Sequence, residues 1–146
     1  MNINYFNYIF CCLLSSFLLL THLSPLANAQ DTSAGLFKSF VFTPVNSFTS
    51  GVEGPAVDSK GNLYAVNFHH SGTIGIVTPE GKAGIFLELP EGSIANGIRF
   101  DSHGNMLIAD YTGHNILKVD MATKELSIFV NRPEMTQPND IAIDSK

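Results

Sequence analysis

The sequence predicts an all-β protein that forms part of a β-propeller, and two observations lead to this prediction. A similar segment begins at Glu53, again at Asn96 and again at Asn139, so that its starts are 43 residues apart. Each unit consists of short apolar and β-branched runs between turn residues, with no sustained helical stripe. Four antiparallel strands in about 40–45 residues make one propeller blade. The chain should therefore hold about two blades and the start of a third.

Each unit is expected to contribute four strands to its blade. The first strands are short and run into a turn of the form Asp-Ser-x-Gly-Asn, which starts at Asp58 and Asp101 and begins again at Asp144. Asp favours the first position of a type I turn and Gly supplies the positive φ that follows, so these aspartates are interpreted as turn formers. We expect the units to align without a gap, with strands at 56–57, 63–68, 73–78 and 83–89, and at 98–100, 106–111, 115–121 and 125–131.

The N-terminal segment resembles a cleaved signal peptide. From Tyr5 to Leu20 the chain is mostly apolar and carries no charge, and Ala27-Asn28-Ala29 precedes Gln30. A short apolar core followed by small residues is typical of an export signal. An uncleaved membrane anchor is the alternative, but the apolar stretch is shorter than the ~20 residues that a span needs. We expect cleavage after Ala29, secretion or release into the periplasm, and no membrane association afterwards.

Charge and cysteine content exclude several classes of function. The chain has 8 basic and 13 acidic residues and a net charge of −5, and its basic residues are scattered singly. Nucleic-acid binding is excluded because it needs clustered Lys and Arg. Both cysteines, Cys11 and Cys12, lie in the leader, so the mature part has neither a disulfide framework nor a thiolate zinc site.

The residues at the repeat starts carry a family resemblance. Glu53-Gly-Pro, Asn96-Gly-Ile and Gln137-Pro138-Asn139-Asp140 resemble the SMP-30/gluconolactonase/LRE-like (regucalcin-type) family over residues 49–146. This resemblance implies a six-bladed propeller with one divalent cation, usually Ca²⁺, in its channel. It also implies hydrolysis of lactones or related esters. On this basis Glu53 and Asn139 are expected metal ligands, and Asn96 binds metal or substrate. The catalytic Asp of the family is expected beyond Lys146.

The residues themselves point to the same kind of site. Glu53, Asn96 and Asn139 share one repeat position, so a radial array would bring them toward the axis, and their oxygens suit Ca²⁺. Asp140 is expected to hydrogen-bond the Asn139 side chain and so to orient it as a metal ligand. The alternative is that Asn-Gly forms a turn and Glu-Gly-Pro caps a loop.

The expected organisation has three parts. Residues 1–29 are the signal peptide, and residues 30–48 are a lead that includes Phe40-Val41-Phe42, a possible strand for closing the ring. Residues 49–146 are a partial propeller with repeats at 53–95, 96–138 and, truncated, 139–146. Because the third turn stops at Lys146, we expect a fragment that lacks activity by itself.

Two other classes of propeller stay open. A non-catalytic propeller of the NHL or YVTN kind would bind a protein or glycan, and a strictosidine-synthase-like propeller would need no calcium. Glu53 in the ligand position weighs against the latter. His69-His70 is expected in a solvated loop, because the second unit has Thr112-Gly113 there, and His103 and His114 are expected in surface turns.

Overall fold

The computed structural model describes residues 38–144 of the chain. The predicted signal peptide, residues 1–29, lies outside the described residues, and export stays a prediction. Among the described residues no helix is long and apolar enough to cross a membrane. Both sheets described below belong to one compact unit, which spans residues 40–146.

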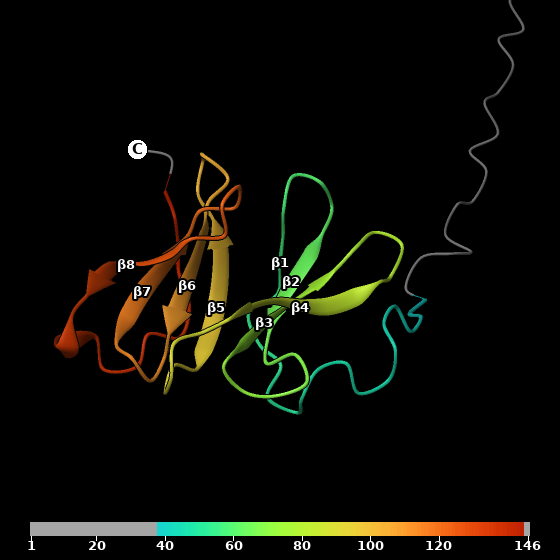
Figure 1. The fold of residues 1–146 in the computed structure, drawn as a ribbon, viewed down its shortest axis with the longest axis horizontal. Helices are drawn as coiled ribbons and strands as arrows, with labels where there is room; N and C mark the ends of the chain where they lie inside the picture. Colours follow the sequence, from blue (N-terminus) through green and yellow to red (C-terminus); the bar gives the residue numbers. More distant parts are fainter. Residues whose placement is uncertain (1–37, 145–146) are drawn as a thin grey trace, which may run out of the picture. The chain divides into compact units, whose positions relative to one another are not determined.

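The chain folds into two four-stranded antiparallel sheets, each formed by consecutive strands (Figure 1). The first sheet, blade 1, consists of β1 (Ala56–Val57), β2 (Leu63–Val66), β3 (Thr73–Val77) and β4 (Ala83–Glu88). The second, blade 2, consists of β5 (Ala95–Phe100), β6 (Met106–Asp110), β7 (Asn115–Val119) and β8 (Leu126–Asn131), and a 3₁₀ turn, η2 (Pro133–Met135), follows it. Two consecutive meander sheets of one repeat are two blades of a β-propeller, and the predicted fold class is confirmed.

The observed strands differ from the predicted ones mainly at their ends. β2 stops at Val66, because Asn67 has a φ of 63° and leaves the extended region. β5 starts at Ala95, three residues before the predicted start. Phe40-Val41-Phe42, the predicted closing strand, forms no strand within the described residues, and its pairing with a final blade stays a prediction.

The prediction that the units align without a gap is wrong for one strand of the blade. Val66 pairs with Ile74 in blade 1, whereas Ala109 pairs with Ile116 in blade 2. The second strands are therefore 43 residues apart and the third strands are 42 apart. Between equivalent paired positions, the connection from the second to the third strand is one residue shorter in blade 2 than in blade 1, and the turn before the fourth strand is one residue longer. Surface loops can change length in this way because their closure entropy depends only weakly on length.

The two blades pack face to face, and this contact, called the seam here, contains the main core. Tyr64 lies at its centre and is 2% exposed. Its ring meets Phe86 edge-on at 5.0 Å and Phe100 edge-on at 5.5 Å between centroids. Burying such rings stabilises the fold by about 25 cal/mol for each Å² of apolar surface removed from water. The other fully buried apolar side chains of the seam are Val66, Ile74, Ala95, Ile98, Met106, Ile108, Leu117 and Val119.

A bulge in each outer strand enlarges the apolar face. Ile74 is opposite Leu87, and Gly75 is opposite Ile85, so Phe86 is an extra residue in β4. Phe129 is the corresponding extra residue in β8, between Ile128 and Val130. In blade 1 the bulge lets two consecutive residues, Phe86 and Leu87, pack on the seam.

The opposite face of blade 1 is covered by the segment that precedes it. Phe48 bridges to Phe68, and the two rings meet edge-on at 5.1 Å. Phe48 also lies directly over Gly75, where an added Cβ would come within 2.8 Å of its ring. Gly75 alternates with Ile74 along β3 and therefore faces away from the seam. Blade 1 thus has protein on both faces.

Two of the predicted turn formers, Asp58 and Asp101, are confirmed by their hydrogen bonds. Asp58 accepts bonds from the backbone N–H groups of Lys60 and Asn62, both 2.9 Å, and from the Tyr64 hydroxyl at 3.2 Å. Asp101 accepts from the N–H groups of His103 and Asn105 in the same way. Burial tends to raise the pKa of both carboxyls, but these hydrogen bonds outweigh it and hold each pKa below its usual value.

Acid should therefore weaken the fold through these two turns. Because their folded pKa values lie below the unfolded value of about 3.9, Asp58 and Asp101 stabilise fully above that value, and this stability is lost as the pH falls through the folded pKa values. The double variant Asp58→Asn, Asp101→Asn should be less stable at neutral pH and should depend less on pH. Urea unfolding at a series of pH values measures both effects.

The exposed Glu91 supplies the control, because Glu91→Gln should leave the pH dependence of stability as it is in the parent chain. If the free energy of unfolding of the double variant changed with pH in the same way as that of the parent chain, the result would contradict the role given to these turns.

Candidate functional site

The three repeat starts lie next to one another in the structure. An added Cβ at Gly54 would overlap the carbonyl oxygen of Asn96. At Gly97 it would come within 2.8 Å of the Asn139 carbonyl oxygen and of Asp140. The backbones at consecutive repeat positions are therefore in direct contact. These residue pairs are called the rim below: Glu53-Gly54, Asn96-Gly97 and Asn139-Asp140.

Glycine makes this close approach possible at two of the three rim positions. Gly54 has a φ of 53°, which a residue with a Cβ rarely adopts, and it has no side chain to hold the next strand away. Gly97, within β5, is buried against the backbone of Asn139 and Asp140. Close backbone packing thus accounts for the glycines in the sequence motifs Glu-Gly-Pro and Asn-Gly.

Asn96 stands in a β-bulge. Ala95 is opposite Asp110, and Ile98 is opposite Ile108, so Asn96 and Gly97 together face a single residue of β6. A bulge bends its strand and changes the direction of the side chains on it. In blade 1 the corresponding backbone is held by β2, because the N–H of Val66 donates to the Glu53 carbonyl at 3.2 Å.

The three predicted ligands have free oxygen atoms. Glu53 and Asn139 are exposed and Asn96 is half-buried, and within residues 38–144 none of these side chains makes a hydrogen bond or ion pair. The described part of the chain contains no group of three His, Cys, Asp or Glu side chains that could hold a metal ion. A cation at the rim would depend on one carboxylate and two amide oxygens, and that these bind one ion stays a prediction.

Asp140 makes contacts that the sequence did not suggest. Its Oδ2 accepts from Arg99 Nη2 at 2.8 Å, and its Oδ1 accepts from the N–H of Ile141 at 2.8 Å. Arg99 also donates to the Ile98 carbonyl at 2.7 Å. The pair ties β5 to the third repeat start, next to Asn139. Asp140 as a support for a metal-bound Asn139 stays a prediction.

A buried carboxyl behind the rim was missed by the sequence analysis. Asp110, at the end of β6, is fully buried. It accepts hydrogen bonds from Ser93 Oγ at 3.0 Å, Asn115 Nδ2 at 2.9 Å and the N–H of Gly113 at 3.0 Å. Ser93 lies three residues before Asn96, so Asp110 fastens the segment that leads to this rim position.

Blade 1 has an equivalent of this contact. Asn67, 43 residues before Asp110, is 5% exposed and donates from Nδ2 to the Gly51 carbonyl at 2.6 Å. Gly51 lies two residues before Glu53. In each blade, then, the side chain at this repeat position, Asn67 or Asp110, holds the segment that leads to the rim. The shared offset of Asn67 and Asp110 was the available sequence signal.

The histidines take no part in a recognisable site among the described residues. His69 stacks on Phe68 with ring centroids 4.2 Å apart, and the Nε2 of His70 lies 3.7 Å from Glu88 Oε1. Both are exposed, as expected for a solvated loop, and so is His103. His114 lies in a turn as expected, but it is half-buried rather than exposed, and its Nδ1 is enclosed without a hydrogen-bond partner.

Comparison with known proteins finds similarity to solved structures. No family model matches the sequence, and no curated protein matches it. The chain is similar to virginiamycin B lyase from Staphylococcus aureus, with 13% identity, a TM-score of 0.49, and coverage of 62% of this chain and 29% of the lyase. It is also similar to the extracellular domain of a hybrid two-component system from B. thetaiotaomicron, with 22% identity, a TM-score of 0.44, and coverage of 57% and 11%.

The chain spans less than a third of either of these proteins. Membership of the SMP-30/gluconolactonase family in particular stays a prediction.

The close backbone approach between successive rim positions can be tested at Gly97. Gly97→Ala should lower the free energy of unfolding by about 1–3 kcal/mol, because the methyl group would press against the Asn139 and Asp140 backbone. Gly84→Ala is the matched control, since nothing lies within 4 Å of its added Cβ, and a change within about 0.5 kcal/mol is expected. Urea unfolding compares the two, and equal effects would contradict the close approach.

The buried carboxyl can be tested in the same assay. Asp110→Ala should cost about 3 kcal/mol, because it leaves the Ser93, Gly113 and Asn115 donors enclosed without an acceptor. Asp110→Asn should cost less than half as much, since blade 1 carries an asparagine at this place. A loss for the alanine variant no larger than for the asparagine variant would count against the fastening role.

Proposed function

We propose that the chain supplies two blades of an exported, calcium-dependent propeller hydrolase that opens lactones or related esters. The observation that supports this is the direct backbone contact between successive rim positions, which carry Glu53, Asn96 and Asn139. Repetition about an axis presents equivalent positions to one centre, and Glu53, Asn96 and Asn139 stand at equivalent positions of the 43-residue repeat.

The donor set fits calcium better than other metals. Calcium takes 6–8 oxygen ligands and accepts carboxylate and amide oxygens, whereas zinc and copper favour nitrogen and sulfur. Glu53 would contribute the negative charge, Asn139 an amide oxygen, and Asn96 an oxygen for the ion or a hydrogen bond for the substrate. Three protein ligands fall short of the usual number, so binding by this chain should be weak.

The chemistry follows from this donor set. Glu53, Asn139 and Asn96 would hold the calcium ion, which when bound would polarise a carbonyl or phosphoryl oxygen and position a water molecule for attack. In the proposed site the Asn96 amide orients the ester, and the bulge and the Asp110 contacts fix the backbone from which Asn96 projects. The base, an Asp on a later blade in the proposal, has no counterpart among the rim residues. The chain by itself should therefore bind the ion and leave lactones intact.

Calcium titration of the chain tests the proposal. We expect a dissociation constant on the order of 10⁻³ M, as in weak extracellular sites. Calcium binding is monitored through the NMR signals of the Asn96 side-chain amide. Glu53→Gln removes the carboxylate charge and should weaken binding by about tenfold or more.

Glu88→Gln is the matched control, because Glu88 is an exposed carboxylate on β4 that pairs with His70. The proposal fails if both variants bind calcium as the parent chain does, or if the Asn96 amide signals do not respond to calcium. Calcium-independent binding of a protein or glycan would favour the non-catalytic propeller instead.

A further inference from the structure

Asn96 combines two properties that make its side chain chemically reactive. It precedes Gly97, and this is the one Asn-Gly pair among the 146 residues of the chain. Its carboxamide is half-buried, and within residues 38–144 it makes no hydrogen bond or ion pair. Because Gly97 has no Cβ, its backbone nitrogen is open to close approach. The Asn96 carboxamide can therefore be attacked by the backbone of its own chain.

Five other asparagines of the two blades have side-chain amides that are held by hydrogen bonds. The Nδ2 groups of Asn62 and Asn105 donate to Asp58 and Asp101, both at 2.9 Å. The three others with a donating Nδ2 are Asn67, Asn115 and Asn131. A held carboxamide has to lose its hydrogen bond before it can turn toward the next backbone nitrogen. Each of these five asparagines is also followed by a residue with a side chain.

The backbone at Asn96 is less constrained than in a regular strand ladder. Asn96 and Gly97 form the bulge of β5 and together face a single residue of β6. A bulge disrupts the ladder locally and leaves its extra residue unpaired. Packing acts in the opposite direction, because the Gly97 nitrogen must move to react and Gly97 lies against the backbone of Asn139 and Asp140. Reaction at Asn96 should therefore be slower in the folded chain than in the unfolded chain.

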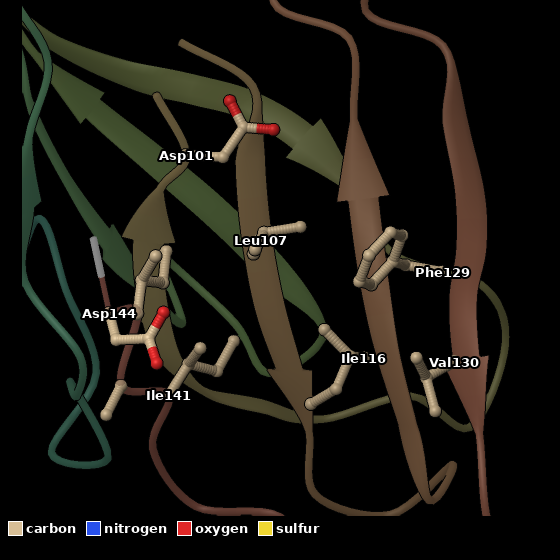
Figure 2. Close-up of a pocket in the computed structure, with 9 residues that line it drawn as sticks. Asp101, Leu107, Ile116, Phe129, Val130, Ile141 and Asp144 are labelled. Carbon is tan, nitrogen blue, oxygen red and sulfur yellow. The ribbon is translucent and has the colours of Figure 1, made fainter. Parts of the chain in front are cut away.

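The reactive pair is separate from the open apolar hollow on blade 2. Figure 2 shows this hollow, of about 740 Å³, between Leu107 and Phe129 on one side and Ile141 on the other. Neither Asn96 nor Gly97 lines it. The reaction at Asn96 can therefore be followed whether or not the hollow is covered.

We propose that Asn96 is a self-modification site, at which the chain converts its own Asn-Gly pair into a carboxylate at the rim. The Gly97 nitrogen attacks Asn96 Cγ and forms a new C–N bond. The bond from Cγ to Nδ2 breaks, and the Gly97 proton leaves with this nitrogen as ammonia. Water then opens the resulting succinimide at one of its two carbonyls, which gives aspartate or isoaspartate. Neither step oxidises or reduces any atom.

The product changes the charge of the candidate cation site, and this consequence rests on the proposed function. The rim residues Glu53, Asn96 and Asn139 carry one carboxylate before the reaction and two after it. The affinity of a calcium site depends on the number of charged oxygen ligands that it offers. The modification therefore gives the rim a slow increase in calcium affinity.

Peptide mapping by mass spectrometry tests the modification. The full chain is kept in mildly alkaline buffer, with and without urea, and samples are taken over weeks. Residue 96 should gain the mass of an amide-to-acid conversion in both series, several-fold more slowly in the folded chain. Asn62 and Asn105 of the folded chain are the internal controls and should stay amides. The proposal is overturned if residue 96 of the folded chain converts no faster than these two residues.

Calcium titration tests the consequence for the rim. Asn96→Asp reproduces one product and should bind calcium about tenfold more tightly than the fresh parent chain. Ageing should shift the parent chain in the same direction. Asn96→Gln is the matched control, because its extra methylene prevents closure of the same ring, and its affinity should not change on ageing.

Unchanged calcium affinity in both Asn96→Asp and the aged parent chain overturns the consequence for the rim. The modification itself is judged from the masses alone, which do not involve calcium. A failure of the proposed calcium site, seen with Glu53→Gln, is therefore distinguishable from a failure of the modification.

Discussion

The structure depends on the mutual burial of two apolar sheet faces. Blade 1 offers Tyr64, Val66 and Ile74 to the seam, and blade 2 offers Ile98, Met106 and Leu117, so that each face is removed from water only by the other. A single four-stranded sheet would leave one of these faces in solvent at a cost of about 25 cal/mol per Å². At the rim, Gly54 and Gly97 let the backbone of one repeat contact that of the next, where a side chain would collide with it.

Much of the fold could be predicted from the sequence. The 43-residue repeat and the alternation of apolar runs with turns indicated four strands per unit, and the Asp58 and Asp101 turns have the hydrogen bonds that their residue types favour. The one-residue displacement of β7 relative to β3 was already contained in the predicted strand starts, 73 and 115, although the units were expected to align without a gap. Two compensating changes in loop length leave the flanking motifs in register, and the strand pairing shows that the third strand has moved.

The positions of the candidate site residues could be predicted from the sequence, whereas the contacts that hold these residues in place could not. Equal spacing was enough to group Glu53, Asn96 and Asn139, and their backbones do lie in succession. Asp110 ends an apolar strand and reads locally as a turn residue, because its partner Ser93 is 17 residues away in the sequence. The ion pair between Arg99 and Asp140 spans 41 residues. Contacts of this range arise from the packing of one repeat on the next, which a single repeat does not encode.

The displaced third strand has a consequence for how such a chain can vary. Its extra and missing residues lie in the loop after the second strand and in the following turn, and they cancel before the fourth strand begins. The first strand and the bulged fourth strand of each blade therefore keep their 43-residue spacing, while the third strand is displaced by one residue. Successive units can diverge in their connecting loops, and acquire different surfaces there, without disturbing the geometry around the axis.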